Sequence, residues 1–118
     1  MRILLALCLA LLALSVQARE YSFNGSKPAV IIDVRTPEEF AAGHIDGAVN
    51  IPVEQIAQGI QSVKGLKKDG TILVYCRSGR RSALAATTLE QQGYKHVLNG
   101  GGLETLAGQL KECSAKSC

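Results

Sequence analysis

A cysteine followed by three arginines within a short segment is the part of this sequence best suited to chemistry. The segment, residues 76–82, reads Cys-Arg-Ser-Gly-Arg-Arg-Ser. It follows an apolar β-type run at 71–75 and precedes a helical pattern at 82–89, so we expect a tight loop between a buried strand and a helix N-terminus. The pKa of a cysteine thiol falls below ~8.5 beside cations and at helix N-termini, and the thiolate is the nucleophile. The segment therefore predicts a nucleophilic Cys76 and an anion-binding loop.

Alternating strand and helix patterns surround this loop and predict an α/β sandwich with a mostly parallel sheet. The β-branched run 29–34 is typical of a strand buried on both faces. The residues from Thr36 to Glu39 form a capping-box pattern with Pro37, and Gly43 is suited to end that helix. The other expected elements are a short strand within 44–52, a helix at 53–63, a turn at 67–70, a strand at 71–75, a helix at 82–92, a strand at 94–98, a flexible loop at 99–102 and a helix at 103–111.

Further candidate residues follow the predicted strands. In parallel sheets, ligands bind outside the carboxyl ends of the strands. Asp33 and Arg35, the segment 44–50, the Cys76 loop and the segment 99–102 all follow predicted strand ends. The sequence therefore predicts that these groups converge on one edge of the sheet.

The first eighteen residues have the pattern of a secretory signal peptide. A charged start, Met1-Arg2, precedes an unbroken apolar run of twelve residues at 3–14. Val16 and Ala18 suit cleavage after about Ala18, and the run is short for a membrane span. We expect a periplasmic or secreted protein, with an uncleaved anchor as the alternative. The expected organisation is a signal peptide at 1–18, a domain at 19–112 and a cysteine-containing tail at 113–118.

Size and charge restrict the expected partners. A chain of 118 residues suits one domain with one core. The formal net charge is +3, or +2 (3 − 1) once Arg2 leaves with the signal peptide, which is too small and too scattered for nucleic-acid binding. Two tail cysteines and dispersed histidines fall short of a zinc ligand set. We expect a monomer with no cofactor, no metal, no nucleic-acid partner and no stable membrane insertion.

Three cysteines remain after removal of the signal peptide, namely Cys76, Cys113 and Cys118. An oxidising compartment favours disulfides, and an odd count leaves one thiol unpaired. Cys113 and Cys118 lie close together in the tail, so we predict that they form a local disulfide and that Cys76 is free. The alternative is that a tail cysteine acts as a resolving thiol toward Cys76.

Four segments, in order along the chain, resemble motifs of the rhodanese family. Residues 33–40 and 43–52 are similar to the two opening motifs, residues 76–82 to the active loop, and Gly101-Gly102-Leu103 to the closing motif. Together they span about residues 29–106, most of the predicted mature chain. The signal peptide and the single short domain resemble the small exported rhodaneses of the phage-shock type. The resemblance implies a three-layer, rhodanese-like α/β sandwich.

The resemblance also implies a thiosulfate sulfurtransferase. Cys76 would attack the outer sulfur of thiosulfate, expel sulfite and hold a persulfide, which a thiophilic acceptor such as cyanide or a thiol then removes. The implied partners are a small anionic sulfur donor and a thiophilic acceptor, with a thiol protein as a further candidate. The alternative function is a persulfide carrier or redox-partner module for which thiosulfate is incidental.

The resemblance assigns the loop residues Arg77, Ser78, Gly79, Arg80 and Arg81 to substrate binding. Backbone N–H groups would surround the sulfur, and guanidinium groups suit the oxygens of sulfite and thiosulfate. Arg80 is the expected anion contact, whereas Arg77 is equally consistent with a solvated side chain. Arg81 stays open between a substrate contact and a structural lock. Gly79 is expected to supply a positive φ or a close approach.

Asp33, Arg35 and Ser82 are expected beside the site. Asp33 and Arg35 either orient the loop or form a salt bridge that holds the first helix, with Glu39 as a further partner, and we favour the salt bridge. His44 is expected to be structural, because attack by an ionised thiolate needs no general base.

Phosphatases and arsenate reductases are the remaining alternative for this fold. Their loops have the pattern Cys-x5-Arg, whereas Arg81 is the fifth residue after Cys76, so this loop is one residue short. A smaller ring of N–H groups suits a single sulfur atom better than a phosphoryl group. We therefore expect sulfur transfer in preference to hydrolysis of an oxyanion.

Overall fold

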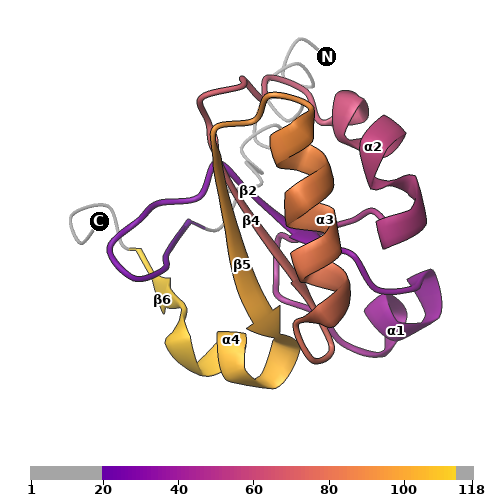
Figure 1. The fold of residues 1–118 in the computed structure, drawn as a ribbon. Helices are drawn as coiled ribbons and strands as arrows, with labels where there is room; N and C mark the ends of the chain where they lie inside the picture. The colour runs from indigo at the N-terminus through magenta and orange to yellow at the C-terminus, as the bar shows by residue number, and fades with distance from the viewer. Residues whose placement is uncertain (1–19, 114–118) are drawn as a thin grey trace, which may run out of the picture.

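The structure, a computed structural model, describes residues 20–113. The predicted signal peptide, its cleavage site and Cys118 lie outside the described residues. Within residues 20–113, no helix combines the length and hydropathy needed to cross a membrane. The elements in chain order are β1 (Tyr21–Ser22), β2 (Val30–Asp33), α1 (Pro37–Ala42), β3 (Val49–Asn50), η3 (Val53–Gln55), α2 (Ile56–Gly59), η4 (Ile60–Ser62), β4 (Thr71–Cys76), α3 (Arg80–Gln91), β5 (His96–Gly102), α4 (Leu103–Gln109) and β6 (Lys111–Glu112) (Figure 1).

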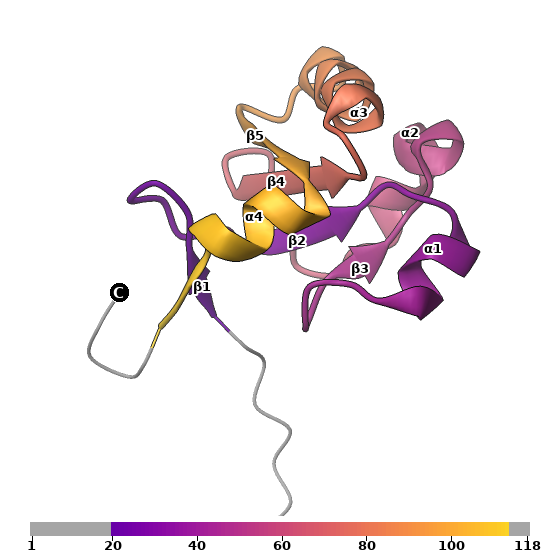
Figure 2. The same ribbon diagram turned by 90° about the horizontal axis from the view of Figure 1, so that it is seen from below.

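The central sheet has four parallel strands in the order β3-β2-β4-β5. The two middle strands pair with Ile31 of β2 opposite Leu73 of β4. Helices α2 and α3 cover one face of the sheet, and α4 covers the other (Figure 1; Figure 2). The expected three-layer α/β sandwich with a mostly parallel sheet is therefore confirmed.

Alternation along β4 divides the apolar core between the two faces of the sheet. Cys76 packs in the cluster that includes Leu89 of α3, and Tyr75 packs in the cluster that includes Leu106 of α4. Successive side chains of a strand point to opposite faces. The candidate nucleophile therefore faces the α3 layer, and its neighbour Tyr75 faces the α4 layer.

The capping box predicted at the first helix is present. The Thr36 hydroxyl accepts from the backbone N–H of Glu39 at 3.1 Å, and the Glu39 carboxylate accepts from the backbone N–H of Thr36 at 2.9 Å. Gly43 is the C-cap residue of α1. This short helix is thus defined at both ends by residues that the sequence identified.

The segment 99–102, predicted to be a flexible loop, is instead the last part of strand β5. That prediction was wrong because it was based on glycine content alone. Gly102 lies opposite Cys76 in the sheet, and a Cβ on Gly100 would lie 3.1 Å from Leu106 and 3.2 Å from Leu73. These two glycines allow close packing beside the cysteine, so they do not mark a mobile loop.

The segment predicted as one helix over 53–63 is three short helical pieces, η3, α2 and η4. A Cβ on Gly59 would lie 2.6 Å from Ile51, so this part of the helix packs closely against the preceding segment. The apolar spacing was still informative, because Ile56 and Ile60 are both buried. The periodicity thus identified the buried face correctly but not the regularity of the helix.

The two ends of the described chain pair with each other. Strand β6 is antiparallel to β1, with Tyr21 opposite Glu112 and Ser22 opposite Lys111. Helix α4 therefore ends at Gln109, earlier than the sequence predicted, since the next residues enter this strand pair. The small two-stranded sheet fixes the C-terminal segment against the N-terminal one.

Candidate active site

The Cys76 sulfur lies in a cradle of N–H groups at the N-terminus of α3. Its Sγ accepts from the backbone N–H of Gly79 at 2.9 Å and from that of Ser82 at 3.4 Å. The Cys76 residue is 0% exposed, and α3 begins at Arg80, four residues after it. A buried sulfur at the positive end of a twelve-residue helix is in a position that favours negative charge.

The pKa of the Cys76 thiol lies below its ordinary value. Burial alone raises this pKa, because it disfavours the charged form. Hydrogen bonds from the hydroxyl and backbone N–H of Ser82, together with the N–H groups of Ser78 and Gly79, lower it by more. The arrangement therefore favours a thiolate, which is the reactive form of cysteine.

Glycines allow the loop and strand β5 to approach each other. Gly79 has φ 96°, and a Cβ there would lie 3.3 Å from the Cα of Gly101, so it has both of the roles that the sequence offered as alternatives. A Cβ on Gly102 would collide with the carbonyl oxygen of Arg77. Any side chain at Gly102 would therefore displace the loop that holds the sulfur.

Ser82 and Asn99 connect the loop to strand β5. Ser82 is fully buried, and its Oγ lies 2.6 Å from Asn99 Oδ1 and 3.5 Å from Cys76 Sγ. Asn99 Oδ1 also accepts from the backbone N–H of Gly101 at 2.9 Å. The sequence placed Asn99 among the residues that follow strands but assigned it no role, since no spacing rule pairs it with a serine seventeen residues earlier.

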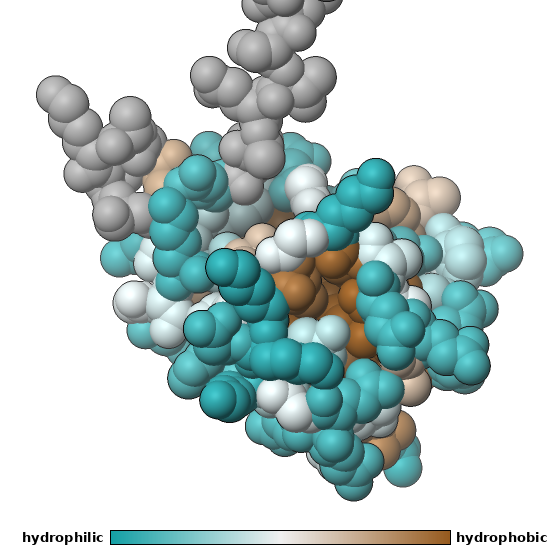
Figure 3. Space-filling model, turned by 90° about the horizontal axis from the view of Figure 1, so that it is seen from above, coloured by the Kyte–Doolittle hydropathy of each residue, from teal (hydrophilic) through white to brown (hydrophobic). Residues whose placement is uncertain are grey.

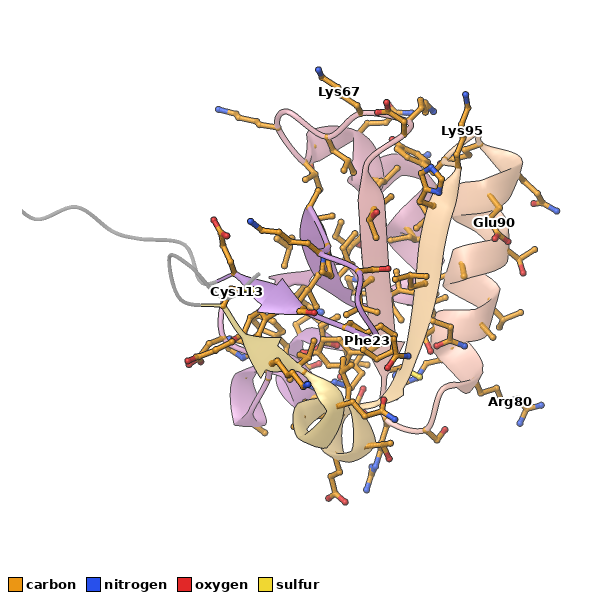
Figure 4. The ribbon with its side chains drawn as sticks, turned by 90° about the vertical axis from the view of Figure 1, so that its left-hand side faces the viewer. Phe23, Lys67, Arg80, Glu90, Lys95 and Cys113 are labelled. Carbon is orange, nitrogen blue, oxygen red and sulfur yellow. The ribbon has the colours of Figure 1, made fainter. Side chains whose placement is uncertain are left out.

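The three arginines of the loop have different surroundings. Arg81 donates to both carboxylate oxygens of Glu39, at 2.8 and 3.1 Å. Arg80 is exposed and extends away from the domain (Figure 4). Arg77 is also exposed but lines a cavity beside the loop. Arg81 thus has the geometry of a structural lock on α1, and Arg77 is the loop arginine that lines the cavity.

Asp33 and Arg35 form a buried ion pair at the end of β2. The guanidinium Nη2 of Arg35 lies 2.6 Å from Asp33 Oδ2, and the side chains are 7% and 0% exposed. The same nitrogen donates to the carbonyl of Gly43 at 2.7 Å. The hydrogen bond to Asp33 raises the pKa of Arg35. This pair holds the end of α1, as expected from the favoured interpretation of Asp33 and Arg35 as a salt bridge. Glu39, the further partner considered, pairs with Arg81 instead.

Tyr75 lies beside this ion pair, and the sequence analysis did not identify it as a candidate residue. Its hydroxyl accepts from the backbone N–H of Ile45 at 3.0 Å, and the Arg35 guanidinium lies 5.8 Å from its ring centre. Burial raises the pKa of Tyr75. A tyrosine in an apolar run carries no sequence signal for such a role.

The cavity beside the loop has a volume of about 440 Å³. Its charged side chains are basic, from the segment after β2 and from the loop, and acidic, from α1 and α4. The lining residues are Arg35, Glu39, Ala42, Arg77, Gly102, Leu103, Glu104 and Thr105. Arg77 and Gly102 are the immediate neighbours of Cys76 along the loop and across the sheet, whereas Cys76 itself is buried and does not line the cavity.

Neither histidine is a hydrogen-bond partner of the Cys76 sulfur. His44 Nδ1 is 2.8 Å from the carbonyl oxygen of Phe40, and the two rings stack at 3.6 Å. His96 is exposed on edge strand β5. Within residues 20–113, no three metal-ligating side chains lie close enough together to hold a metal ion.

Cys76 is a free cysteine, whereas Cys113 takes part in a disulfide. The partner of Cys113 lies outside the described residues, so its pairing with Cys118 stays a prediction. The free thiol is therefore the one at the end of β4, in the N–H cradle.

Known proteins resemble this chain in sequence and in fold. Residues 18–105 match the sequence profile of the rhodanese-like domain. The thiosulfate sulfurtransferase PspE of Escherichia coli is 43% identical over 76 residues, which are 64% of this chain and 72% of PspE. The putative sulfur carrier protein YrkF of Bacillus subtilis is 35% identical over 86 residues, which are 73% of this chain and 45% of YrkF. A solved structure of an E. coli rhodanese with anions has a TM-score of 0.63 and 38% identity, covering 71% of this chain and 98% of that one.

Proposed function

This chain belongs to the rhodanese family, and from that premise we propose that it is a thiosulfate sulfurtransferase that works through a persulfide on Cys76. The observation that carries the proposal is the N–H cradle around the Cys76 sulfur at the start of α3. A relative that is 43% identical is named a thiosulfate sulfurtransferase.

The first half-reaction is a displacement at sulfur. The Cys76 thiolate attacks the outer sulfur of thiosulfate, forming a sulfur–sulfur bond, while the bond between the two thiosulfate sulfurs breaks and its electron pair leaves on sulfite. The product is a Cys76 persulfide anion, so the total charge is unchanged. The N–H groups that hold the thiolate also stabilise the charge that moves onto the outer sulfur.

The second half-reaction restores the enzyme. A thiolate acceptor attacks the outer persulfide sulfur, and the electron pair of the broken bond returns to the Cys76 sulfur. The acceptor leaves as its own persulfide, or as thiocyanate when the acceptor is cyanide. No oxidant or reductant is consumed in either half-reaction.

We assign the oxyanion contact to Arg77. Arg77 is the residue that follows Cys76 and it lines the cavity beside the loop, whereas Arg81 is paired with Glu39 and Arg80 extends away from the domain. A guanidinium group provides several N–H donors in the geometry that sulfonate-type oxygens accept. A structural relative is described as a rhodanese with anions, which supports the proposal of an oxyanion contact here.

The test is the intact mass of the purified mature protein after incubation with thiosulfate, followed by removal of small molecules. The expected result is a gain of one sulfur atom, which vanishes when cyanide is added. Cys76→Ala is the control and gains nothing. A wild-type protein that stays unmodified, or a Cys76→Ala protein that gains the same mass, would overturn the proposal.

The second candidate function is a sulfur carrier, and the relative named as a putative sulfur carrier protein is the observation that favours it. The two functions differ in the source of the sulfur. A carrier would acquire its persulfide faster from a protein donor than from thiosulfate. Steady-state rates with saturating thiosulfate and cyanide, compared with rates of loading by a persulfide-bearing protein, separate the two.

The proposal includes export from the cytoplasm. The charged and apolar pattern of residues 1–18 supports it, and Cys113 is disulfide-bonded, as suits an oxidising compartment. The measurement is the N-terminal sequence of the protein recovered from fractionated cells. A periplasmic or secreted protein that begins near Arg19 is expected, and a cytoplasmic protein that begins at Met1 would contradict it.

A further inference from the structure

The Ser82 hydroxyl carries one proton but has three neighbours that can accept it. These are Asn99 Oδ1 at 2.6 Å, the carbonyl oxygen of Gly79 at 3.0 Å and Cys76 Sγ at 3.5 Å. Because the distance to Asn99 is the shortest, the proton lies between Ser82 and Asn99. The thiol of Cys76 then donates its own proton to the Ser82 oxygen.

The orientation of the Asn99 amide is fixed by a separate contact. The backbone N–H of Gly101 donates to Asn99 Oδ1 at 2.9 Å, so this atom must be the amide oxygen. The amide nitrogen of Asn99 points instead to the carbonyl of Gly79, at 3.4 Å. Asn99 therefore presents an acceptor to Ser82 and does not donate to it.

We propose that Asn99 is a positioning residue that regulates the reactivity of Cys76 by competing with its sulfur for the Ser82 hydroxyl proton. In the thiol state, the proton lies toward Asn99. When Cys76 ionises, its S–H bond breaks, the proton passes to water, and the Ser82 O–H rotates from Asn99 toward the sulfur. Ionisation therefore requires loss of a short hydrogen bond in exchange for a longer one.

This competition has a direct consequence for the thiolate. The backbone N–H groups of Gly79 and Ser82 stabilise its charge at all times, because the backbone fixes their direction toward the sulfur. The Ser82 hydroxyl contributes only when it turns away from Asn99. Removing Asn99 takes away the nearest competing acceptor and leaves only the Gly79 carbonyl, at 3.0 Å, to compete with the sulfur. The thiolate then attracts the donor more strongly than this neutral carbonyl does, because a hydrogen bond to a charged group contributes more than one between neutral groups.

The test is the pH dependence of Cys76 alkylation by iodoacetamide, followed by mass spectrometry of the peptide that contains Cys76. The inference depends on the proposed function only in taking Cys76 as the nucleophile, and alkylation needs no sulfur transfer. In Asn99→Ala, the apparent pKa is expected to fall by up to about one unit. In Ser82→Ala, it is expected to rise, since a donor is lost.

The double variant Ser82→Ala/Asn99→Ala decides the mechanism. If Asn99 acts through the Ser82 proton, the double variant has the same pKa as Ser82→Ala alone. A purely structural role predicts instead that Asn99→Ala shifts the pKa equally in both backgrounds. That result, or an unchanged or raised pKa in Asn99→Ala, would overturn the proposal.

A matched control comes from Asn50, another amide at the carboxyl edge of the sheet. Its Nδ2 donates to the carbonyls of Asp33 and Arg35. Asn50 belongs to β3, which is the edge strand at the opposite side of the sheet from β5. Asn50→Ala is expected to leave the Cys76 pKa unchanged.

If Asn99→Ala does not fold, Asn99→Ser is the second variant. The shorter serine side chain does not reach Ser82, so the same downward shift of the Cys76 pKa is expected.

Discussion

The two ends of the central sheet are stabilised in different ways. At the carboxyl end, polar side chains bond to one another in pairs, such as Asp33 with Arg35 and Ser82 with Asn99. Asp33, Arg35 and Ser82 are buried, and among residues 20–113 no buried side-chain nitrogen or oxygen lacks a hydrogen-bond partner. The carboxyl end therefore depends on particular pairs of residues.

The amino end is built from turns and exposed lysines. Lys68 Nζ donates to the carbonyl of Gln92 at 2.8 Å and lies 4.1 Å from the Tyr94 ring centre. Lys67 and Lys95 lie at this end, far from Arg80 (Figure 4). Seen from above, this end has a hydrophobic centre bordered by hydrophilic residues (Figure 3).

This difference indicates which end of the sheet is more sensitive to substitution. At the amino end, exposed cations contact backbone atoms and a ring, and such contacts are individually weak. At the carboxyl end, removing one partner leaves a buried polar group unsatisfied. Substitutions at the carboxyl end should therefore alter chemistry or stability strongly, and those at the amino end should alter neither by much.

The largest expected effect is that of Cys76→Ser on turnover. Serine is similar in size and accepts the same N–H bonds, so the fold should remain, but a hydroxyl is a poor nucleophile for sulfur. We expect sulfur transfer to fall by a factor of at least about 10³, measured as thiocyanate formation. A variant that keeps a tenth of the wild-type rate would place the nucleophile elsewhere.

The buried ion pair should have the largest effect on stability. Arg35→Met leaves the Asp33 carboxylate buried without its partner, so the free energy of unfolding should fall by about 3–5 kcal/mol, measured by urea denaturation. The double variant Asp33→Asn/Arg35→Met removes the unpaired charge and should recover part of the loss. If both variants are as stable as wild type, the pair does not hold the end of α1.

The two exposed arginines of the loop form a matched comparison. Arg77→Gln should raise the KM for thiosulfate about 10-fold, because a charge-assisted contact is lost. Arg80→Gln should change this KM by less than about 2-fold, since Arg80 does not line the cavity. The reverse order in steady-state kinetics would assign the oxyanion contact to Arg80.

The pair between Arg81 and Glu39 should give stability a pH dependence. The hydrogen bond from Arg81 lowers the pKa of Glu39 from 4.5 to about 2. A lowered folded-state pKa means that this stabilisation is complete above pH 4.5 and is lost as the pH falls toward 2. Glu39→Gln should cost about 1 kcal/mol at neutral pH. By thermal unfolding, its difference from wild type should diminish in acid.

The smallest effect is expected at the amino end. Lys68→Ala removes the contacts with Gln92 and Tyr94, and we expect the free energy of unfolding to change by no more than about 0.5 kcal/mol. The rate of sulfur transfer should be unchanged. A loss of activity in this variant would show that the two ends of the sheet are coupled.

Local sequence patterns predicted the features that depend on near neighbours. The capping box from Thr36 to Glu39 formed because its donors and acceptors are three residues apart. A positive φ at Gly79 was one of the two roles expected for this glycine in the turn between a strand and a helix. The β-branched run and the alternating elements likewise predicted the parallel sheet, because hydrophobic burial is set by composition and period.

Predictions failed where packing between distant segments decided the outcome. The glycines at 99–102 form a strand because Gly102 pairs with Cys76 and Gly100 fits against Leu106. Glycine alone does not distinguish a mobile loop from a close approach, since both require the absence of a side chain.

By itself, the sequence determined that this protein is an α/β domain with a cysteine placed just before a helix. A strand, a turn and a helix N-terminus suffice to create that position, and all three are local. Only the tertiary structure decided which groups surround the sulfur. It directed Arg81 to Glu39, Arg77 to the cavity, and Asn99 to Ser82. Such pairings join residues far apart in the chain, and no short-range pattern specifies them.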